Sequence, residues 1–178
     1  MNLIISLIYA PVVFYSLQNF ELQIVSLCIF LFSIIWFILT FKKGIKEYFF
    51  SVLYIFISIL AYFLDSFTVL KILPFLISFF ISSFILYTYI SRNSFIFIFL
   101  EKIKKEVLDD EKEYIQKSTL FWFFVSLVNL AFHSFVLYNG NIQYWIFYSS
   151  IGWYFIFIIA GIIQFTHKKL YFNKEKNV

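Results

Sequence analysis

The sequence predicts an all-α polytopic membrane protein: a bundle of six transmembrane helices with an amphipathic cytoplasmic segment between helices 4 and 5. Hydrophobic residues make up 62% of the chain and charged residues 13%, whereas soluble domains carry roughly 25% charged residues. The mean hydropathy is +0.89. Six apolar stretches fill the 178 residues, and Lys and Arg gather between alternate stretches, a pattern typical of cytoplasmic loops.

The first three apolar stretches predict three helices. Residues 3–20 form a stretch that is short for a span of roughly 17 to 25 residues. A cleaved signal peptide requires a basic region and a small-residue cleavage site, which this stretch lacks, so we expect a retained helix. The second span covers residues 22–41. The third covers residues 48–64 and stops at Asp65.

The second half of the chain predicts three more spans. The fourth runs over residues 69–90 and the fifth over residues 118–138, separated by a hydrophilic loop at 92–117. After a short polar turn, the sixth span covers residues 144–166. Residues 1–178 are therefore expected to form a single transmembrane domain.

The distribution of cations predicts the orientation. Of the 14 Lys and Arg residues, all except Lys71 lie in the loops after the second and fourth spans or in the C-terminal tail. Because cationic loops stay on the cytoplasmic side, we expect a multi-pass protein of the bacterial inner membrane with both termini cytoplasmic. The remaining loops are short and leave no room for an external catalytic domain.

The loop at 92–117 is the one sizeable soluble piece. Its apolar run at 95–100 is too short to span and is expected at the interface or as a continuation of the fourth helix. Ile103, Val107 and Tyr114 share one face of a helix among charged residues, which predicts an amphipathic helix on the membrane surface. Its cations are candidates for contact with a cytoplasmic partner or anionic lipid, or else only orient a solvated connector. These are Arg92, Lys102, Lys104, Lys105 and Lys117.

Small and polar residues recur inside the spans at steps of three and four, which keeps one face of each helix against a neighbour. In hydrocarbon, small residues allow close approach and hydroxyls bond between helices. We therefore expect this polar seam to pack inward and Phe, Ile and Leu to face lipid. The seam comprises Ser6, Tyr9, Ser16, Ser26, Ser33, Thr40, Ser51, Tyr54, Ser58, Ala61, Asp65, Lys71, Pro74, Ser78, Ser82, Tyr89, Thr119, Trp122, Ser126, Asn129 and His133.

Four residues are candidates for ligand binding. Asn129 and His133 lie one turn apart on the fifth span, and such buried polar groups are costly unless they are paired. They form either a proton relay or ligand pair, or simply satisfied packing residues. Lys71 and Asp65 lie near the outer boundary, where they form an ion pair or receive an anionic headgroup or acyl carboxylate. Pro74 is expected to kink the fourth helix beside Lys71.

Motifs for other functions are missing from the sequence. It contains no phosphate-binding loop, no nucleophile elbow, no HExxH and no dinucleotide fingerprint. The single Cys28 and the isolated His133 make a poor metal site. Since the cations are spread over three regions, nucleic-acid binding is not expected. We therefore predict a protein that is not an enzyme and has no catalytic residue, metal or cofactor.

Three short motifs resemble a poorly characterised family of small bacterial inner-membrane proteins. They are Leu70-Lys71-Ile72-Leu73-Pro74, Tyr114-x-x-Lys117-x-Thr119, and Phe121-Trp122-Phe123-Phe124 followed by Asn129. Members of that family are encoded beside fatty-acid and aryl-polyene type biosynthetic genes. More distantly, the chain is similar to the intracellular septation protein A family through its length, Asp65 with Lys71, and the stretch from Trp122 to Asn129. The resemblance implies a role in envelope or acyl-lipid biogenesis.

The sequence and the resemblance together favour a non-enzymatic protein that supports cell-envelope or acyl-lipid biogenesis, as a scaffold or as a bundle that holds a lipid. One alternative is a small transporter or exporter of an amphipathic acid or lipid. A second is a septation or envelope-maintenance protein. The expected partners are membrane lipids, cytoplasmic acyl-chain enzymes or envelope and division proteins, and a second copy of the chain.

Overall fold

A computed structural model describes residues 3–42, 44–102 and 109–175. Within these residues the chain is helical, with no strand. It divides into two compact units, each described separately here. The first unit contains residues 1–77 and 133–151, and the second contains residues 78–132 and 152–178.

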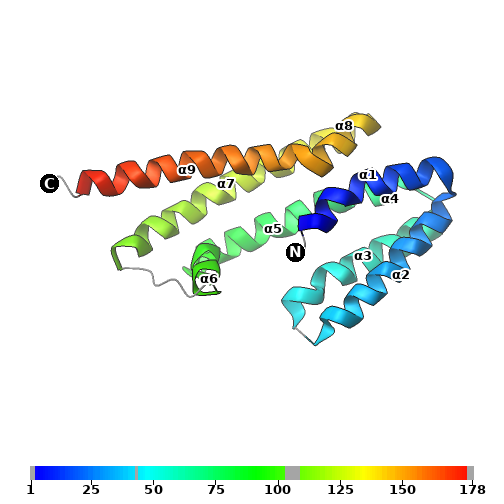
Figure 1. Ribbon diagram of the computed structural model, residues 1–178, viewed down its shortest axis with the longest axis horizontal. Helices are drawn as coiled ribbons and strands as arrows, with labels where there is room; N and C mark the ends of the chain where they lie inside the picture. Colours follow the sequence, from blue (N-terminus) through cyan, green and yellow to red (C-terminus); the bar gives the residue numbers. More distant parts are fainter. Residues whose placement is uncertain (1–2, 43, 103–108, 176–178) are drawn as a thin grey trace. The chain divides into compact units, whose positions relative to one another are not determined.

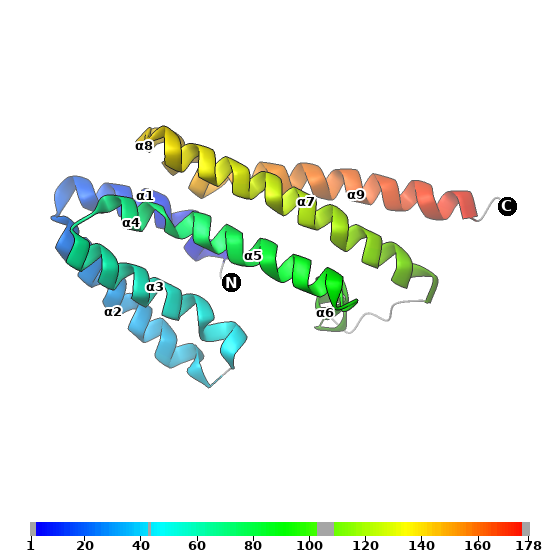
Figure 2. The ribbon, with the colours of Figure 1, turned by 180° about the vertical axis from the view of Figure 1, so that it is seen from behind.

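The first unit is built on a helical hairpin. Helices α2 (Leu22–Phe41) and α3 (Ile45–Leu64) lie side by side, as Figures 1 and 2 show. Gly44 joins them with a φ of 100°, a conformation that glycine adopts without steric cost. Helix α1 (Leu3–Asn19) contacts α2 and α8 (Ile142–Phe147). The predicted second span has the bounds of α2, and the predicted first and third spans correspond to α1 and α3.

The predicted fourth span is interrupted near its start. Helix α4 (Phe67–Lys71) is followed, after Ile72, by α5 (Leu73–Ile90). Pro74 is the second residue of α5, where its missing amide hydrogen and fixed φ are tolerated. The interruption lies two residues before Pro74, at the place where a kink is expected. Residues beyond Ile77 belong to the second unit.

In the second unit, side chains of α7 (Asp109–Asn139) contact both α5 and α9 (Trp153–Glu175). The side-chain amide of Asn129 reaches α5, and the Trp122 indole donates to Gln164 Oε1 of α9. The Trp122 and Phe157 rings stack with an interplanar angle of 11°. Toward the other end of α9, Lys168 pairs with Glu111 at 2.7 Å.

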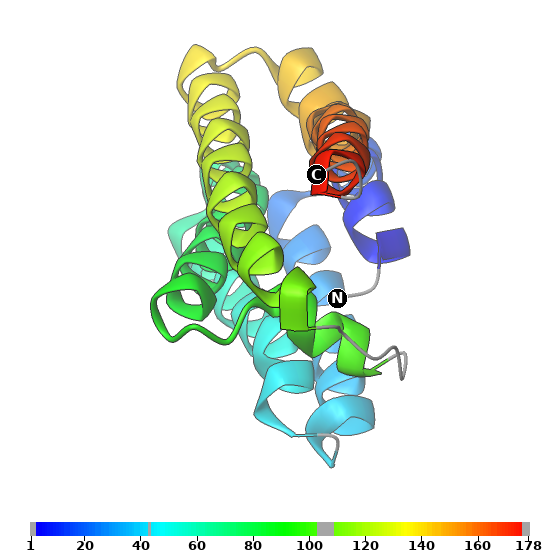
Figure 3. The ribbon, with the colours of Figure 1, turned by 90° about the vertical axis from the view of Figure 1, so that its left-hand side faces the viewer.

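Two expectations for the loop at 92–117 are corrected. Helix α6 (Phe95–Lys102) does not continue α5 but runs across its direction, as Figures 1 and 3 show. The polar residues 109–117 form the first turns of α7, which continues unbroken through the predicted fifth span. They are therefore not part of a separate surface helix. Ile103 and Val107 lie outside the described residues.

The last predicted span is also longer than expected. Its helix begins at α8, passes through a π-helical segment at Tyr148–Gly152 and continues as α9 to Glu175. Asn141 caps α8 by accepting from the amides of Gln143 and Tyr144. A Cβ added at Gly161 would meet nothing within 4 Å, so close packing does not require glycine at this position.

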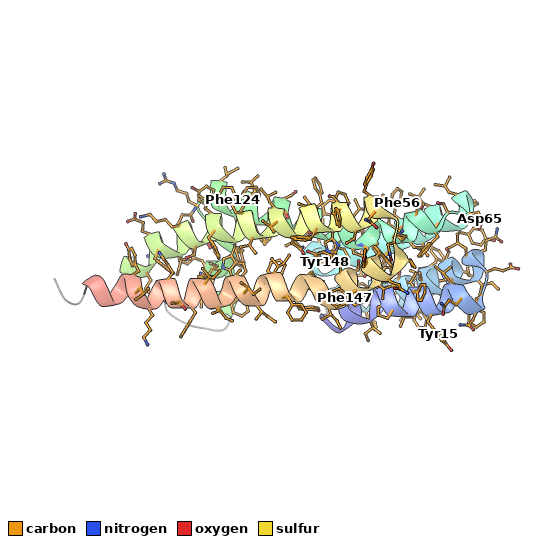
Figure 4. The ribbon with its side chains drawn as sticks, turned by 90° about the horizontal axis from the view of Figure 1, so that it is seen from above. Tyr15, Phe56, Asp65, Phe124, Phe147 and Tyr148 are labelled. Atoms are coloured by element: carbon orange, nitrogen blue, oxygen red, sulfur yellow. The ribbon has the colours of Figure 1, made fainter. Side chains whose placement is uncertain are left out.

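The expected inward packing of the seam is confirmed for most of its described residues, although Asp65 is exposed. Almost all seam residues of α2, α3, α5 and α7 are buried, among them Ser26, Ser58 and Thr119 at 0% exposure. Large apolar side chains cover the outside, including Phe56 and Phe124, which project outward in Figure 4. Most seam hydroxyls, however, donate to carbonyls of their own helix rather than across an interface. Examples are Ser33 to Ile29, Ser51 to Tyr48, Ser58 to Ile55 and Ser126 to Phe123.

Four helices, counted within the described ranges, are long and apolar enough to cross a membrane. They cover Leu22–Phe41, Phe67–Ile90, Glu111–Asn139 and Ile142–Tyr171. The described apolar part of α3, Tyr48–Leu64, is shorter. The chain is therefore an all-helical protein with four candidate membrane-spanning helices.

Candidate functional site

The helix break beside Pro74 places two backbone carbonyls where intrahelical donors are missing. Because Pro74 has no amide hydrogen, it cannot donate to the carbonyl four residues earlier, that of Leu70. The Tyr9 hydroxyl donates to this carbonyl instead, at 3.1 Å. The Trp145 indole Nε1 donates to the carbonyl of Lys71 at 3.0 Å. Aromatic side chains from α1 and α8 thus supply hydrogen-bond donors to these two carbonyls.

Lys71 itself is buried at this break, with 8% of its surface exposed. Its Nζ lies 5.6 Å from the centre of the Phe67 ring, and that ring meets Trp145 edge-on. Such a cation–π contact stabilises an ammonium by about 0.5–2 kcal/mol. Within the described ranges no ion pair joins Lys71 to Asp65, so the expected pair is not formed. Asp65 instead ends α3 in a left-handed conformation with its side chain exposed (Figure 4).

Asn129 and His133 lie one turn apart on α7 but have different neighbours. Asn129 Nδ2 donates to Ser78 Oγ on α5 at 2.8 Å. The His133 ring meets the Tyr148 ring edge-on, with centres 4.8 Å apart, and Tyr148 lies between α7 and the following helix in Figure 4. Both residues are buried, each with 5% exposure. These contacts match the packing alternative for each residue.

An open polar site lies in the second unit, at the end of α5. A pocket of about 680 Å³ opens between this end, α6 and the first turns of α7, which appear together in Figure 3. Three cations and one carboxylate line it, together with polar and apolar neighbours. The basic pocket, as we call it, is lined by Tyr89, Ile90, Arg92, Phe97, Lys112, Glu113, Gln116 and Lys117.

A Schellman motif at the end of α5 positions Arg92. The amide of Asn93 donates to the Thr88 carbonyl, and the amide of Arg92 donates to the Tyr89 carbonyl, the paired bonds that define this motif. Arg92 takes the left-handed position with φ 53°, where glycine is usual. This conformation is strained for a side chain by about 1 kcal/mol. The turn ends α5 and places Arg92 among the residues that line the basic pocket.

The α7 side of the basic pocket is held by hydrogen bonds to neighbouring helices. Gln116 Nε2 donates to the Tyr89 carbonyl at 2.6 Å, and Thr119 bonds the Ser94 hydroxyl just before α6. Lys117 pairs with Glu113 one turn earlier at 2.7 Å. Lys112 and Gln116 are also one turn apart, so both line the same pocket.

The basic pocket contains two of the five cations proposed from sequence. Arg92 and Lys117 line it, whereas Lys102 ends α6 with a side chain outside the described part of the molecule. Lys104 and Lys105 lie outside the described residues altogether. Lys112 and Gln116 were not among the candidates. Their spacing of four residues was the available signal, but it becomes informative only if α7 begins before residue 112.

A second pocket of about 280 Å³ lies between α7 and α9. Its aromatic residues are Tyr114, Phe121, His167 and Tyr171, and Lys117 lies at both pockets. The Tyr114 hydroxyl lies 3.3 Å from both the Gln164 carbonyl and His167 Nδ1. These contacts hold α9 against the polar turns of α7 next to the basic pocket.

Comparison of the chain with protein-family models, characterised proteins and solved structures finds no match.

Proposed function

We propose that this protein is a non-enzymatic, multi-pass inner-membrane protein that supports acyl-lipid or envelope biogenesis by holding an anionic lipid. The basic pocket carries the proposal. Arg92, Lys112 and Lys117 gather at the point where α7 changes from charged to apolar sequence. At this depth a lipid phosphate or carboxylate meets cations while its acyl chains meet an apolar helix surface.

The proposed topology has six spans with both termini cytoplasmic. Helices α2 and α3 lie side by side and each contain 20 residues, so a slab crossed by α2 is also crossed by α3. Helix α7, with 31 residues, is about 46 Å long, whereas the hydrocarbon core is about 30 Å thick. Its charged first turns therefore project toward the cytoplasm in this arrangement and bring the basic pocket to the inner surface.

Lipid holding is favoured here over transport. A carrier often has broken helices whose unpaired backbone groups bind substrate, and the break at Pro74 is the candidate for such a site. The carbonyls of Leu70 and Lys71, however, already accept hydrogen bonds from Tyr9 and Trp145. The basic pocket, in contrast, is open and lined by cations.

The proposal predicts that Arg92→Gly weakens binding of anionic lipid about tenfold, the loss of one charge-assisted contact. Glycine suits the left-handed turn at Arg92, so this variant removes the charge while relieving backbone strain. Lipid retained after detergent purification is measured by native mass spectrometry, and affinity is measured in nanodiscs doped with phosphatidylglycerol.

Asp65→Gly provides the matched control, because it relieves a left-handed residue at the end of α3 without touching the basic pocket. We expect this variant to retain lipid like the unchanged protein. Equal lipid retention by Arg92→Gly and the unchanged protein would count against the proposal, as would the absence of any retained anionic lipid.

A further inference from the structure

The residues that line the basic pocket carry more positive charge than negative charge. Three cations line it, whereas the Glu113 carboxylate is the one anionic group among the described lining residues. Three positive charges less one negative charge give these residues a net charge of +2. The cations are Arg92, Lys112 and Lys117. This net charge matches a ligand that carries two negative charges rather than one.

The anionic group of the pocket and its ion-pair partner keep their charges near neutral pH. Lys117 Nζ lies 2.7 Å from a Glu113 carboxylate oxygen. This hydrogen bond and the charge of Lys117 lower the pKa of Glu113, and the same contact raises the pKa of Lys117. Both residues therefore stay ionised between about pH 5 and pH 8. A guanidinium such as that of Arg92 is charged throughout this range.

The backbone at the end of α5 opposes an anion less than an uncapped helix end does. The last carbonyl groups of a helix carry partial negative charge. Here the Thr88 carbonyl accepts from the amide of Asn93. The Tyr89 carbonyl accepts from the amide of Arg92 and from Gln116 Nε2. The carbonyl of Tyr89, a residue that lines the pocket, is thus already bonded to two donors.

Arg92 itself indicates an anionic ligand. Glycine is usual at its left-handed position, where a side chain is strained, and strained residues cluster at functional sites. Arginine also presents a planar fork of donors that pairs with two oxygens of one phosphate group. A phosphate ligand accounts for arginine at a position that favours glycine.

We infer that the basic pocket binds a phosphate monoester as its dianion, as in the headgroup of phosphatidic acid. A monoester has three terminal oxygens and close to two negative charges at neutral pH, whereas the phosphodiester of phosphatidylglycerol has one charge. The Arg92 fork pairs with two of these oxygens, and a pocket lysine pairs with the third. Ile90 and Phe97, which line the same pocket, contact the first part of the acyl chains. This inference rests on the proposed function and names the headgroup class.

The direct test compares a monoester with a diester at two pH values. Phosphatidic acid and phosphatidylmethanol with the same acyl chains are each doped into phosphatidylcholine nanodiscs. At about pH 8 we expect the protein to prefer phosphatidic acid about fivefold, because of its second charge. At about pH 5 the monoester has lost most of its second charge, so the preference should nearly disappear. Equal affinity at pH 8, or a preference that is the same at both pH values, would overturn the inference.

Substitutions that change the net charge of the pocket test its source. Arg92→Gly and Lys112→Gln each remove one positive charge, so each should reduce the preference at pH 8 to about twofold. Glu113→Gln removes the negative charge and should strengthen both the binding and the preference. Lys169→Gln is the matched control, because Lys169 is an exposed cation of α9 that lines neither pocket. A loss of preference in Lys169→Gln equal to that in Lys112→Gln would show that total charge, not the pocket, sets the preference.

Titration of the protein is controlled separately. His167 of α9 contacts Tyr114 and lines the second pocket, next to the basic pocket. His167→Gln should keep the pH-dependent preference, and its loss in this variant would contradict titration of the ligand. The phosphodiester is a second control, since it keeps one charge at both pH values. The lining residues that can ionise are Tyr89, Arg92, Lys112, Glu113 and Lys117, and α6 contributes Phe97.

Competition distinguishes a lipid from a soluble phosphate monoester. Glycerol phosphate and inorganic phosphate are added to the nanodiscs at equal concentration. Retention of phosphatidic acid supports a lipid ligand, whereas its displacement supports the same dianion chemistry from a soluble source.

The two proposals fail in different ways. If the protein binds neither anionic lipid above the phosphatidylcholine background, the proposed function fails. If Arg92→Gly weakens binding but phosphatidic acid and phosphatidylmethanol bind alike at both pH values, only the headgroup inference fails.

Discussion

At the helix break in the first unit, individual side chains donate hydrogen bonds to backbone carbonyl groups that lack a donor within the helix. An acceptor exposed to hydrocarbon costs several kcal/mol, so a proline kink in a membrane helix requires donors from elsewhere. Tyr9 and Trp145 supply them to Leu70 and Lys71. Both donors are aromatic residues with an apolar body and a polar tip, a combination suited to such a position. Trp145 is 1% exposed and is the largest fully buried side chain described.

At this scale, Trp145→Phe should lower stability by about 1–3 kcal/mol, because the Lys71 carbonyl would remain buried without this donor. The measurement is the thermal unfolding midpoint in detergent. Trp36→Phe is the control, since the Trp36 ring packs edge-on against Tyr54, a contact that phenylalanine can retain. Similar midpoints for the two variants would show that the indole hydrogen bond contributes little.

At the scale of the elements, the seams were predictable and several helix ends were not. A repeated step of three and four residues, as from Ser51 to Ala61, defines a face because helix geometry is regular. The bounds of α2 follow from charged residues at both ends. The end of α5 depends on a left-handed Arg92, for which the sequence offers no glycine signal. The start of α7 was not predicted, because its first turns are hydrophilic and were therefore assigned to a loop. The residues of these turns nevertheless have favourable helix propensities.

The basic pocket was only partly predictable for the same reason. The positive charge of Arg92 and Lys117 was visible in the sequence. Their proximity to Gln116 depends on the Schellman turn and on α7 beginning early, neither of which hydropathy reports. Hydropathy measures transfer into lipid, whereas helix ends depend on local backbone bonds.

The break between α4 and α5 yields a prediction about coupling. Pro74→Ala restores an amide hydrogen that can donate to the Leu70 carbonyl, so the Tyr9 hydroxyl becomes less necessary. Tyr9→Phe should therefore destabilise the protein less in the Pro74→Ala background, with a coupling of roughly 0.5–1 kcal/mol. Unfolding of the two single variants, the double variant and the unchanged protein completes the cycle. Additive effects would mean that Pro74 and Tyr9 act independently.

At the scale of the whole molecule, side chains are distributed in the reverse of the usual soluble pattern. Buried positions include many Ser and Thr residues, while large apolar side chains such as Phe32, Phe63 and Phe165 are more than two-thirds exposed, at 72%, 78% and 73%. Water would penalise such a surface, because contiguous apolar patches on soluble proteins rarely exceed a few hundred Å². Lipid tails solvate Phe and Ile at no such cost, and the small buried residues allow helices to approach closely.

This distribution leads to a test of the number of spans. If α2 and α3 both cross the bilayer, Lys42 and Ser66 lie on opposite sides. If only the four longest helices cross, these two residues lie on the same side. We expect opposite sides, because α2 and α3 pack along one another. The measurement replaces Cys28 with serine, introduces Lys42→Cys or Ser66→Cys, and labels intact and permeabilised vesicles with a membrane-impermeant maleimide.

Asn93→Cys and Asn141→Cys calibrate this labelling. Asn93 precedes α6 and α7, and Asn141 follows α7, so the two residues lie on opposite sides whether the chain has six spans or four. Labelling of Lys42→Cys together with Asn93→Cys, and of Ser66→Cys together with Asn141→Cys, agrees with six spans. Lys42→Cys and Ser66→Cys labelled from one side would instead place α3 along the membrane surface or within one leaflet. In that case the polar seam between α2 and α3 could not lie across the bilayer, and the argument that both helices cross together would fail.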